Sequence, residues 1–204
     1  MQLGAAEWNL ILSRRWFTDS VVDSYMTLLA KHASVSVLTY SCSWFNTLFF
    51  TQNTAKPKVC LFSSENIGKA WFSGDGIAQV SYIIVPGSVS NAHFVVVVID
   101  MHARCIHMCD SMFGTHKNVV SQITRYMCQE YFLTTGQPLD VSLFTYSNYT
   151  EWDTHFPKQV DTHSCGAYVC LMAKCILLKK CLRFQSAQSI RITVCYELCN
   201  DVLL

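Results

Sequence analysis

The sequence predicts an α+β fold in which helices flank a central mixed or antiparallel sheet. Apolar residues recur at helical spacing in two stretches, 20–31 and 119–131. Between them, β-branched residues are concentrated in short apolar runs over residues 80–99. A third helix-like stretch, 165–178, is almost entirely apolar and follows a polar loop. Neighbouring strands with helices on either side in the sequence indicate one domain covering residues 1–204.

The composition argues against several classes of partner. The formal net charge of the 204 residues is +1 and 14% of them are charged, so no basic field favours nucleic acid. The longest aliphatic run, Val95–Ile99, is far shorter than the roughly 20 residues of a membrane-spanning helix. The first residues, Met1–Phe17, lack the charged-then-apolar layout of a signal peptide. We therefore expect a protein that binds neither nucleic acid nor a membrane.

The cysteines indicate a reducing compartment. Eleven cysteines without a CxxC pair suggest free thiols inside the cell rather than a disulfide framework, and the sequence does not distinguish nucleus from cytoplasm. Cys105, His107 and Cys109 alternate along one expected strand. Steps of roughly 6.5 Å place their side chains too far apart to share a zinc ion. We expect no metal, no cofactor and a monomer.

The N-terminal quarter predicts one clear helix. It runs from about Ser20 to about Lys31, with Thr18 or Asp19 available as the N-cap. The segment Val35–Phe50 is rich in Val, Thr, Trp and Phe, and fits either a short helix or irregular packed chain. Turn-forming residues recur over Thr51–Gly76, which predicts a surface connection.

Three strands follow. Val80–Val85 predicts a strand that stops at Pro86-Gly87, and His93–Ile99 predicts a second strand, apolar on both faces and therefore central. After a loop at about Asp100–Ala103, Arg104–Asp110 predicts a third strand, antiparallel to the second.

The second half of the chain predicts three helices and a strand. Apolar residues over Val119–Tyr131 indicate a helix that ends before Gly136. Leu139–Tyr146 alternates as a strand does. The apolar stretch Cys165–Leu178 predicts a buried helix, and a last amphipathic helix begins at about Ser189.

Cys165 is the strongest candidate nucleophile. It stands where the polar loop changes into the apolar helix, so unpaired N–H groups and the positive end of the helix dipole favour its thiolate. The next residue, Gly166, would admit close approach by a substrate backbone. A buried structural cysteine is the alternative, since free cysteines are among the most buried residues, and the catalytic interpretation therefore needs partner residues.

His93 and Asp110 are the candidate partners. If the hairpin loop is centred between Met101 and His102, His93 lies directly opposite Asp110, within reach of an imidazole–carboxylate hydrogen bond. A histidine oriented by an aspartate and presented to Cys165 supplies the base that a cysteine nucleophile requires. A register shifted by one residue would separate the pair.

Four sequence segments resemble the Ulp/SENP cysteine proteases, which cut and mature ubiquitin-like proteins, chiefly SUMO. Residues 16–29 resemble the family's W-L-x-D-x-x-I-x-x-Y-x-x-L-L opening. Residues 93–100 are similar to its H-W-x-L-x-V-I-D strand, and residues 110–112 match its D-S-M. Gln159 followed by residues 164–166 is similar to Q-x-x-x-x-D-C-G. The resemblance implies a papain-like fold of the Ulp/SENP type.

The resemblance also implies catalytic roles. Cys165 would attack the carbonyl of the glycine that ends the ubiquitin-like tail, His93 would carry the proton, and Asp110 would orient His93. Gln159 would form the oxyanion hole together with the backbone N–H of Cys165. Ser164 stands where the family has an aspartate, so the support given by that carboxylate is missing from this position.

Three further residues would bind the substrate on the same resemblance. Trp16 and Phe94 would form a narrow tunnel over the Gly-Gly tail, and Asp19 would pair with a basic residue of the ubiquitin-like protein. Phe94 replaces the family's tryptophan, which makes the tunnel lid smaller and removes an indole donor.

The expected function is that of a thiol protease acting after the C-terminal Gly-Gly of a ubiquitin-like modifier, as a deconjugating isopeptidase, a precursor-processing enzyme, or both. The motifs favour SUMO, and ubiquitin or NEDD8 is the first alternative because Phe94 would lie along the tail. A polyprotein protease of the viral or mobile-element adenain kind shares the catalytic order but lacks the W-x-x-D opening. A last alternative is an inactive module that binds a ubiquitin-like protein, although all four catalytic positions are filled.

Overall fold

The computed structural model describes residues 4–50, 76–148, 158–179 and 186–204. The predicted surface connection Thr51–Gly76 lies almost wholly outside these ranges. The elements along the described chain are α1 (Ala5–Leu12), α2 (Asp19–His32), β1 (Val37–Thr39), α3 (Cys42–Phe50), η3 (Ile77–Gln79), β2 (Tyr82–Val89), β3 (His93–Asp100), β4 (Cys105–Cys109), α5 (Lys117–Thr135), η4 (Val141–Leu143), β5 (Thr145–Asn148), α7 (Cys165–Leu178) and α8 (Ala187–Asn200).

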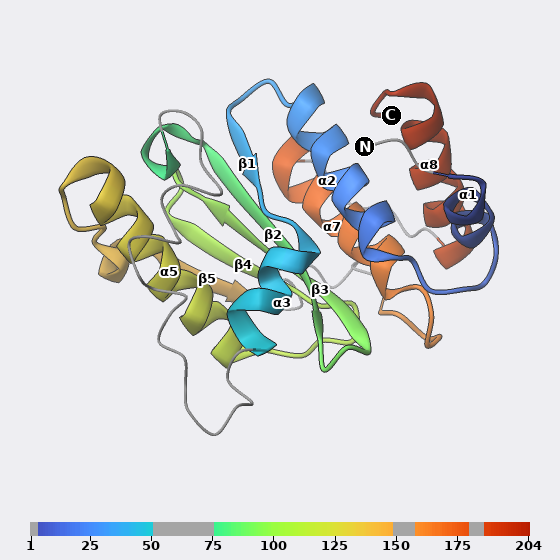
Figure 1. Ribbon diagram of the computed structural model, residues 1–204, viewed down its shortest axis with the longest axis horizontal. Coiled ribbons are helices and arrows are strands. Elements are labelled where there is room, and N and C mark those ends of the chain that lie inside the picture. The colour runs from blue at the N-terminus through green and yellow to red at the C-terminus, as the bar shows by residue number, and fades with distance from the viewer. Residues whose placement is uncertain (1–3, 51–75, 149–157, 180–185) are drawn as a thin grey trace.

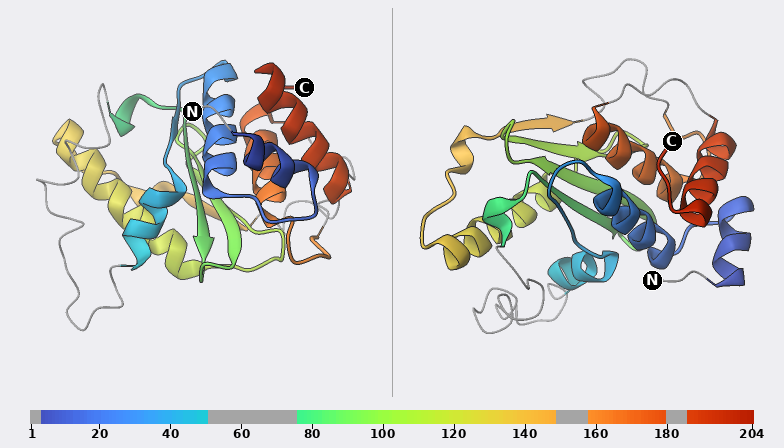
Figure 2. Two further views of the ribbon diagram at one scale, coloured as in Figure 1. Left: turned by 45° about the vertical axis from the view of Figure 1, so that its right-hand side comes forward. Right: turned by 90° about the horizontal axis from the view of Figure 1, so that it is seen from above.

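The five strands form one mixed sheet in the order β1-β2-β3-β4-β5 (Figure 1). The outer pairs β1–β2 and β4–β5 are parallel, whereas β2–β3 and β3–β4 are antiparallel. Helices cover both faces of the sheet (Figure 2). This arrangement confirms the predicted α+β class, with β3 at the centre.

Strand β3 separates two apolar clusters because its side chains alternate between the faces of the sheet. Val96 and Val98 pack in the cluster under α2, α7 and α8, whereas Val95 and Val97 pack in the cluster under α3 and α5. The prediction that this strand is apolar on both faces is confirmed. Together the two clusters fix the sheet between its helices, and helix α7 packs directly on β3.

The N-terminal half agrees with the helix prediction and adds elements to it. Thr18 is the N-cap of α2, where its hydroxyl accepts the N–H of Val21 at 3.4 Å. Helix α1 was not predicted. The ambiguous segment Val35–Phe50 contains both strand β1 and helix α3.

Strand β2 does not stop at Pro86-Gly87 as predicted but continues to Val89. Because β1 pairs with β2 only as far as Ile84, Pro86 lies on a free edge, where a missing N–H costs no ladder bond. Gly87 is needed for packing, since a Cβ there would lie 2.0 Å from the ring of Phe45.

The predicted strand Leu139–Tyr146 is also wrong in its first half. Asp140 accepts the N–H of Ser142 at 3.0 Å and starts the short 3-10 helix η4. Such side-chain capping competes with extended backbone. The strand proper is β5, which pairs in parallel with β4.

The hairpin of β3 and β4 has a different register from the predicted one. Asp100 pairs with Cys105, which leaves a loop of four residues, Met101–Arg104. The carboxylate of Asp100 accepts hydrogen bonds from the N–H groups of His102 and Ala103 at 3.0 and 2.8 Å. The loop therefore begins at Met101, one residue later than the predicted start at Asp100. His93 is therefore not directly opposite Asp110, which follows the last residue of β4. Every partner moves by two positions, so the alternation of faces is kept and the two residues remain within side-chain reach.

Candidate active site

Cys165 is the first residue of α7 and is 1% exposed. The preceding residue, Ser164, accepts the N–H groups of Ala167 and Tyr168 through its carbonyl oxygen, so the helix begins at the thiol. The predicted place of Cys165 at a loop-to-helix boundary is confirmed. Gly166 has a packing role in the structure, because a Cβ there would lie 2.7 Å from Phe17.

His93, the first residue of β3, lies between Cys165 and Asp110. Its Nε2 is 2.5 Å from Asp110 Oδ1. Burial acts to lower the pKa of His93, but hydrogen bonds with Asp110 and with Cys165 raise it to about 9. Since Nε2 faces the carboxylate, the other ring nitrogen is left for the thiol. The structure therefore brings together the three residues that the sequence nominated.

The carboxylate of Asp110 is almost completely buried and accepts four hydrogen bonds. Oδ1 accepts from His93 and from the N–H of Met112 at 2.7 Å. Oδ2 accepts from the N–H of Gly114 at 2.9 Å and from His116 Nε2 at 2.7 Å. Burial raises the pKa of Asp110, but the hydrogen bonds of His116 and His93 outweigh it and hold the pKa well below its usual range.

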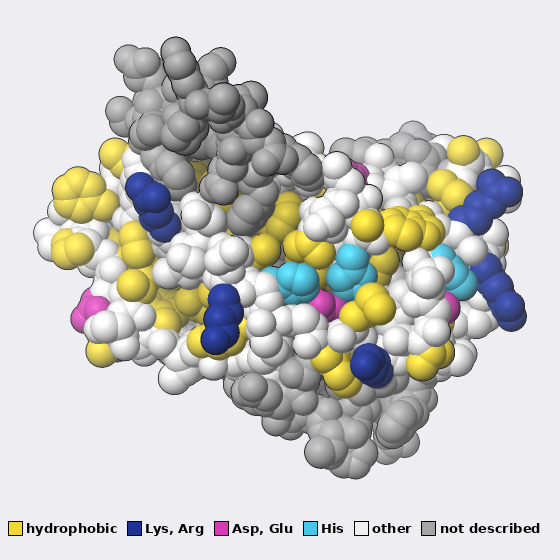
Figure 3. Space-filling model, turned by 90° about the horizontal axis from the view of Figure 1, so that it is seen from below, with side chains coloured by type: hydrophobic (Ala, Val, Ile, Leu, Met, Phe, Trp, Pro, Cys, Tyr) yellow, Lys and Arg dark blue, Asp and Glu magenta, His cyan; other side chains and the backbone are white. Residues whose placement is uncertain are grey.

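His116 is the site residue that the sequence did not nominate. It precedes α5 and lies in a loop, six residues after Asp110. From the sequence alone, a histidine in a loop is expected to be a solvent-exposed residue without a role. No spacing rule connects it to Asp110, because the contact depends on two left-handed residues, Phe113 and His116 itself. Figure 3 shows histidine side chains close together on one face of the molecule, with acidic and apolar side chains beside them.

Gln159 is buried, with 4% of its surface exposed, and links two loops of the site. Its Oε1 accepts the hydroxyl of Ser111 at 2.7 Å, and its backbone N–H donates to the carbonyl of Ser111 at 2.9 Å. Its Nε2 donates to the carbonyl of Asp161 at 2.7 Å. The side chain is therefore held in one orientation.

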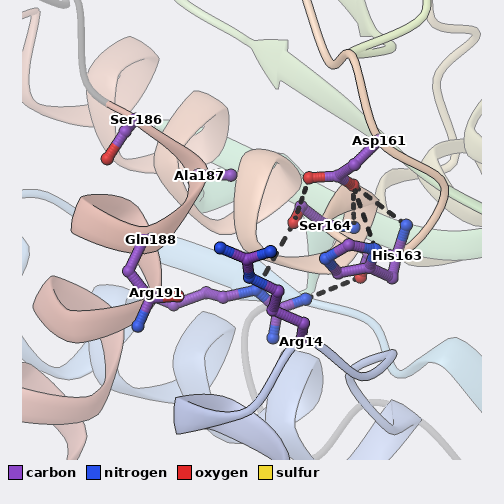
Figure 4. A pocket seen from close by; sticks show the side chains of 8 residues that line it. All are labelled: Arg14, Asp161, His163, Ser164, Ser186, Ala187, Gln188 and Arg191. Carbon is purple, nitrogen blue, oxygen red and sulfur yellow. Dashed lines mark hydrogen bonds and ion pairs between the residues drawn. The ribbon is translucent and has the colours of Figure 1, made fainter.

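Ser164 is connected to Asp161 and Arg191 (Figure 4). Its hydroxyl donates to Asp161 Oδ2 at 2.8 Å and accepts from Arg191 Nε at 3.4 Å. The other carboxylate oxygen of Asp161 accepts the N–H groups of His163 and Ser164 at 2.9 and 2.8 Å, and these bonds hold its pKa below the ordinary value despite partial burial. The three residues line a cavity of about 240 Å³ beside the turn that carries the thiol.

Arg191, from α8, is 1% exposed and joins the N-terminal segment to this turn. Its guanidinium lies over the ring of Phe17, 4.8 Å from the centroid. It donates to the carbonyl oxygens of Leu10, Ile11, Ser13, Arg15 and His163. A buried cation is thus satisfied by backbone dipoles from two segments far apart in the sequence.

The residues nominated for substrate binding differ in exposure. Trp16 is 42% exposed and Asp19 is exposed at the start of α2, where partial burial nevertheless raises its pKa. Phe94 is 4% exposed and belongs to the apolar cluster that also contains Phe17 and Cys165. Phe94 therefore lies in the same apolar cluster as the thiol, and Trp16 lies at the surface.

The arrangement suits nucleophilic acyl transfer. A thiol at a helix N-terminus, an imidazole that interacts with it and a carboxylate bonded to the imidazole are the components of thiol-based catalysis. Across the described ranges, no three His, Cys, Asp or Glu residues are grouped so that they could hold a metal ion. The same part of the chain contains no helix long and apolar enough to cross a membrane.

Comparison with known sequences identifies relatives. The model of the Ulp1 protease family, C-terminal catalytic domain, matches residues 15–203. Sentrin-specific protease 2 of Pongo abelii is 25% identical over 173 residues, which are 85% of this chain and 28% of that protein. Ubiquitin-like-specific protease 1 of Saccharomyces cerevisiae is 19% identical over 177 residues, 84% of this chain and 25% of that protein. The chain thus spans about a quarter of the length of the curated relatives it matches.

Solved structures share the fold. The C-terminal Ulp1 protease domain in complex with Smt3, the yeast ortholog of SUMO, has a TM-score of 0.69 at 18% identity, covering 96% of this chain and 82% of that chain. Ulp1 with its catalytic cysteine oxidised to a sulfonic acid has a TM-score of 0.70 at 16% identity, covering 98% and 85%. The predicted Ulp/SENP type of fold is confirmed.

Proposed function

The chain belongs to the Ulp1 protease family, whose members are cysteine proteases, and from this premise we propose that it cleaves after the C-terminal Gly-Gly of a ubiquitin-like modifier. The observation that carries the proposal is the position of His93, which is hydrogen-bonded to Asp110 and interacts with the thiol of Cys165 at the start of α7. We assign the activity to a single catalytic domain covering residues 1–204.

Cys165 is the nucleophile in this proposal. Its thiolate attacks the carbonyl carbon of the last glycine, and a carbon–sulfur bond forms as the carbonyl oxygen takes the negative charge. His93 then donates its proton to the leaving amine, the carbon–nitrogen bond breaks and a thioester remains. Water hydrolyses the thioester while His93 accepts its proton. Asp110 holds the imidazole in the orientation that both transfers need.

Two donors stabilise the oxyanion. The N–H of Cys165 is at the start of α7, where backbone N–H groups have no acceptor within the helix. Gln159 contributes its amide, which Ser111 and Asp161 hold in place. Preorganised donors of this kind are worth about 2.7–4 kcal/mol each to the transition state.

SUMO is the substrate that we propose, acting either as a precursor or as a conjugate. The matched relatives include sentrin-specific protease 2 and the Ulp1 domain solved with Smt3. Trp16 and Phe94 would enclose the Gly-Gly tail, and Asp19 would pair with a basic residue of the modifier. The nine free cysteines of the described residues fit a reducing, intracellular compartment.

Ubiquitin is the second candidate substrate. The Xanthomonas campestris effector XopD bound to ubiquitin shares the fold with a TM-score of 0.53 at 14% identity, covering 92% of each chain. Different members of one fold can therefore bind different modifiers, and NEDD8 is a further candidate substrate.

A panel of SUMO, ubiquitin and NEDD8 probes with electrophilic C-termini tests the proposal. We expect the SUMO probe to form a covalent adduct, which peptide mass spectrometry places on Cys165. Cys165→Ser should abolish labelling, whereas Cys170→Ser, a matched change of a buried thiol on the same helix, should not. If only the ubiquitin probe or only the NEDD8 probe labelled the protein, that modifier would be the substrate in place of SUMO. If no probe labelled it, the proposed function would be overturned.

A further inference from the structure

Asp110 is shared by two histidines that bind different oxygens of its carboxylate. His93 faces Oδ1 and His116 faces Oδ2, at 2.5 and 2.7 Å. The proposed mechanism uses only the first contact. A carboxylate bonded at both oxygens cannot rotate about its last bond without breaking a charge-assisted hydrogen bond.

Gly114 shows that the second contact is built into the loop. A Cβ at this residue would lie 2.5 Å from both Asp110 Oδ2 and His116 Nε2. The backbone N–H of Gly114 also donates to Oδ2 at 2.9 Å. Only a residue without a side chain therefore leaves room for His116 to reach the carboxylate.

The backbone around Gly114 adopts conformations that are unfavourable for ordinary residues. Phe113 has a φ of 70° and His116 has a φ of 39°, both in the left-handed region. Such conformations are unfavourable and persist where the surroundings determine them, most often at functional sites. Here the N–H of Phe113 donates to the carbonyl of Asp110 at 3.0 Å, and the carbonyl of His116 accepts the N–H groups of Val119 and Val120 at the start of α5.

We propose that His116 is a positioning residue of the catalytic centre, which holds Asp110 Oδ2 so that Oδ1 remains directed at His93. The proposal rests on the proposed function for its effect on turnover, but the contact itself does not depend on any substrate. Both the neutral Nε2–H form and the imidazolium form of His116 can donate this bond. The hydrogen bond from His116 is also the strongest of those that lower the pKa of Asp110 against the effect of burial.

The decisive variants change the donor at residue 116. His116→Phe removes the donor and keeps an aromatic ring, and His116→Gln retains an N–H donor. His102→Phe is the matched control, since His102 is an exposed loop histidine bonded to Ser81. We expect His116→Phe to lower kcat about 10- to 100-fold with little change in KM, because small misplacements of catalytic groups have effects of this size. His116→Gln should recover most of the activity, and His102→Phe should match the wild type.

Two substrate-independent readouts separate this inference from the proposed function. In the proton NMR spectrum, His116→Phe should remove the downfield imidazole resonance of His116 and shift the one of His93. The same variant should slow alkylation of Cys165 by iodoacetamide. Gly114→Ala, whose Cβ would force Asp110 Oδ2 and His116 Nε2 apart while leaving both residues chemically unchanged, should give the same two changes, and thermal unfolding shows whether each variant is folded.

The contrary results are distinct for the two proposals. A His93 resonance and an alkylation rate that are unchanged in folded His116→Phe would overturn the positioning role. A Gln variant as impaired as the Phe variant would overturn the hydrogen-bond basis of that role. If the wild type cleaved no ubiquitin-like modifier, the proposed function would be wrong, and the NMR and alkylation results would still decide the role of His116.

Discussion

The hydroxyl of Ser164 donates a hydrogen bond to Asp161 Oδ2 at 2.8 Å, so the residue before the nucleophile is bonded to a carboxylate three positions earlier. The same carboxylate accepts two backbone N–H groups of the turn that leads to Cys165. The turn is thus fixed by a charge-assisted network although residue 164 carries no charge itself.

Asp161→Ala should loosen this turn. It removes four hydrogen bonds to a partly buried carboxylate, from Gln159 Nε2, the N–H groups of His163 and Ser164, and the hydroxyl of Ser164. We expect a loss of about 1–2 kcal/mol in the free energy of unfolding together with a lower kcat. Urea denaturation and steady-state kinetics measure the two effects. Asp140→Ala is the matched control, because Asp140 bonds the N–H and hydroxyl of Ser142 in an exposed turn outside the site. Equal kcat in the two variants would contradict a role of Asp161 at the site.

Ser111→Ala should reduce turnover through Gln159. Without the hydroxyl of Ser111, Gln159 Oε1 loses its buried donor, and the amide is held in place by Asp161 alone. We expect kcat to fall by roughly 10-fold, against roughly 10²- to 10³-fold for Gln159→Ala, which removes the donor itself. Ser147→Ala serves as control, since Ser147 is buried and its hydroxyl has no partner among the described residues. A Ser111→Ala enzyme with wild-type kcat would exclude this coupling.

The pH dependence of kcat/KM should have an alkaline limb near pH 9. The pKa of His93 is raised to about 9 by Asp110 and Cys165, in spite of burial, and above it the imidazolium that protonates the leaving amine is lost. Asp110→Asn removes the stabilising charge and should move the limb to lower pH, whereas Asp140→Asn should leave it in place. An alkaline limb that Asp110→Asn does not move would argue against the assignment to His93.

The same shift predicts how stability depends on pH. The folded-state pKa of His93 lies above the value of about 6.5 expected for the unfolded chain, so the folded protein binds this proton more tightly. The resulting stabilisation is complete below about pH 6.5 and is lost as the pH rises through about 9. His93→Gln should therefore flatten the unfolding free energy between these two pH values, as measured by denaturant titration at each pH.

Arg191→Met should be the most destabilising of these changes. Its guanidinium satisfies five backbone carbonyls and the hydroxyl of Ser164, and each buried acceptor left without a donor costs about 1–3 kcal/mol. We expect a loss of at least about 3 kcal/mol in the free energy of unfolding, with Arg125→Met, an exposed change on α5, near zero. Arg191→Lys should recover little, because an ammonium cannot donate in so many directions. A small effect of Arg191→Met would mean that water replaces these bonds.

Local sequence patterns were sufficient for most of the elements and for the nucleophile. Helix α2, helix α7 and the central strand β3 follow from the periodicity of apolar residues, because each has to bury a defined face. Cys165 was identifiable at a loop-to-helix boundary for the same reason. The rule that proline ends a strand was misleading at Pro86. Strand β2 continues past this residue because the neighbouring strand β1 pairs with β2 only as far as Ile84.

The partners of the site depended on tertiary structure. The hairpin register was set by two hydrogen bonds of Asp100 that spacing alone does not predict, and His93 and Asp110 meet without being directly opposed. His116 reaches Asp110 only because Phe113 and His116 adopt left-handed backbone conformations, and Arg191 joins segments almost the whole chain apart. The sequence by itself thus determined which residues can do the chemistry, through periodicity and resemblance to a family. Only the tertiary structure decided how those residues are held, because hydrogen bonds between distant loops depend on distances and dihedral angles that a linear pattern does not contain.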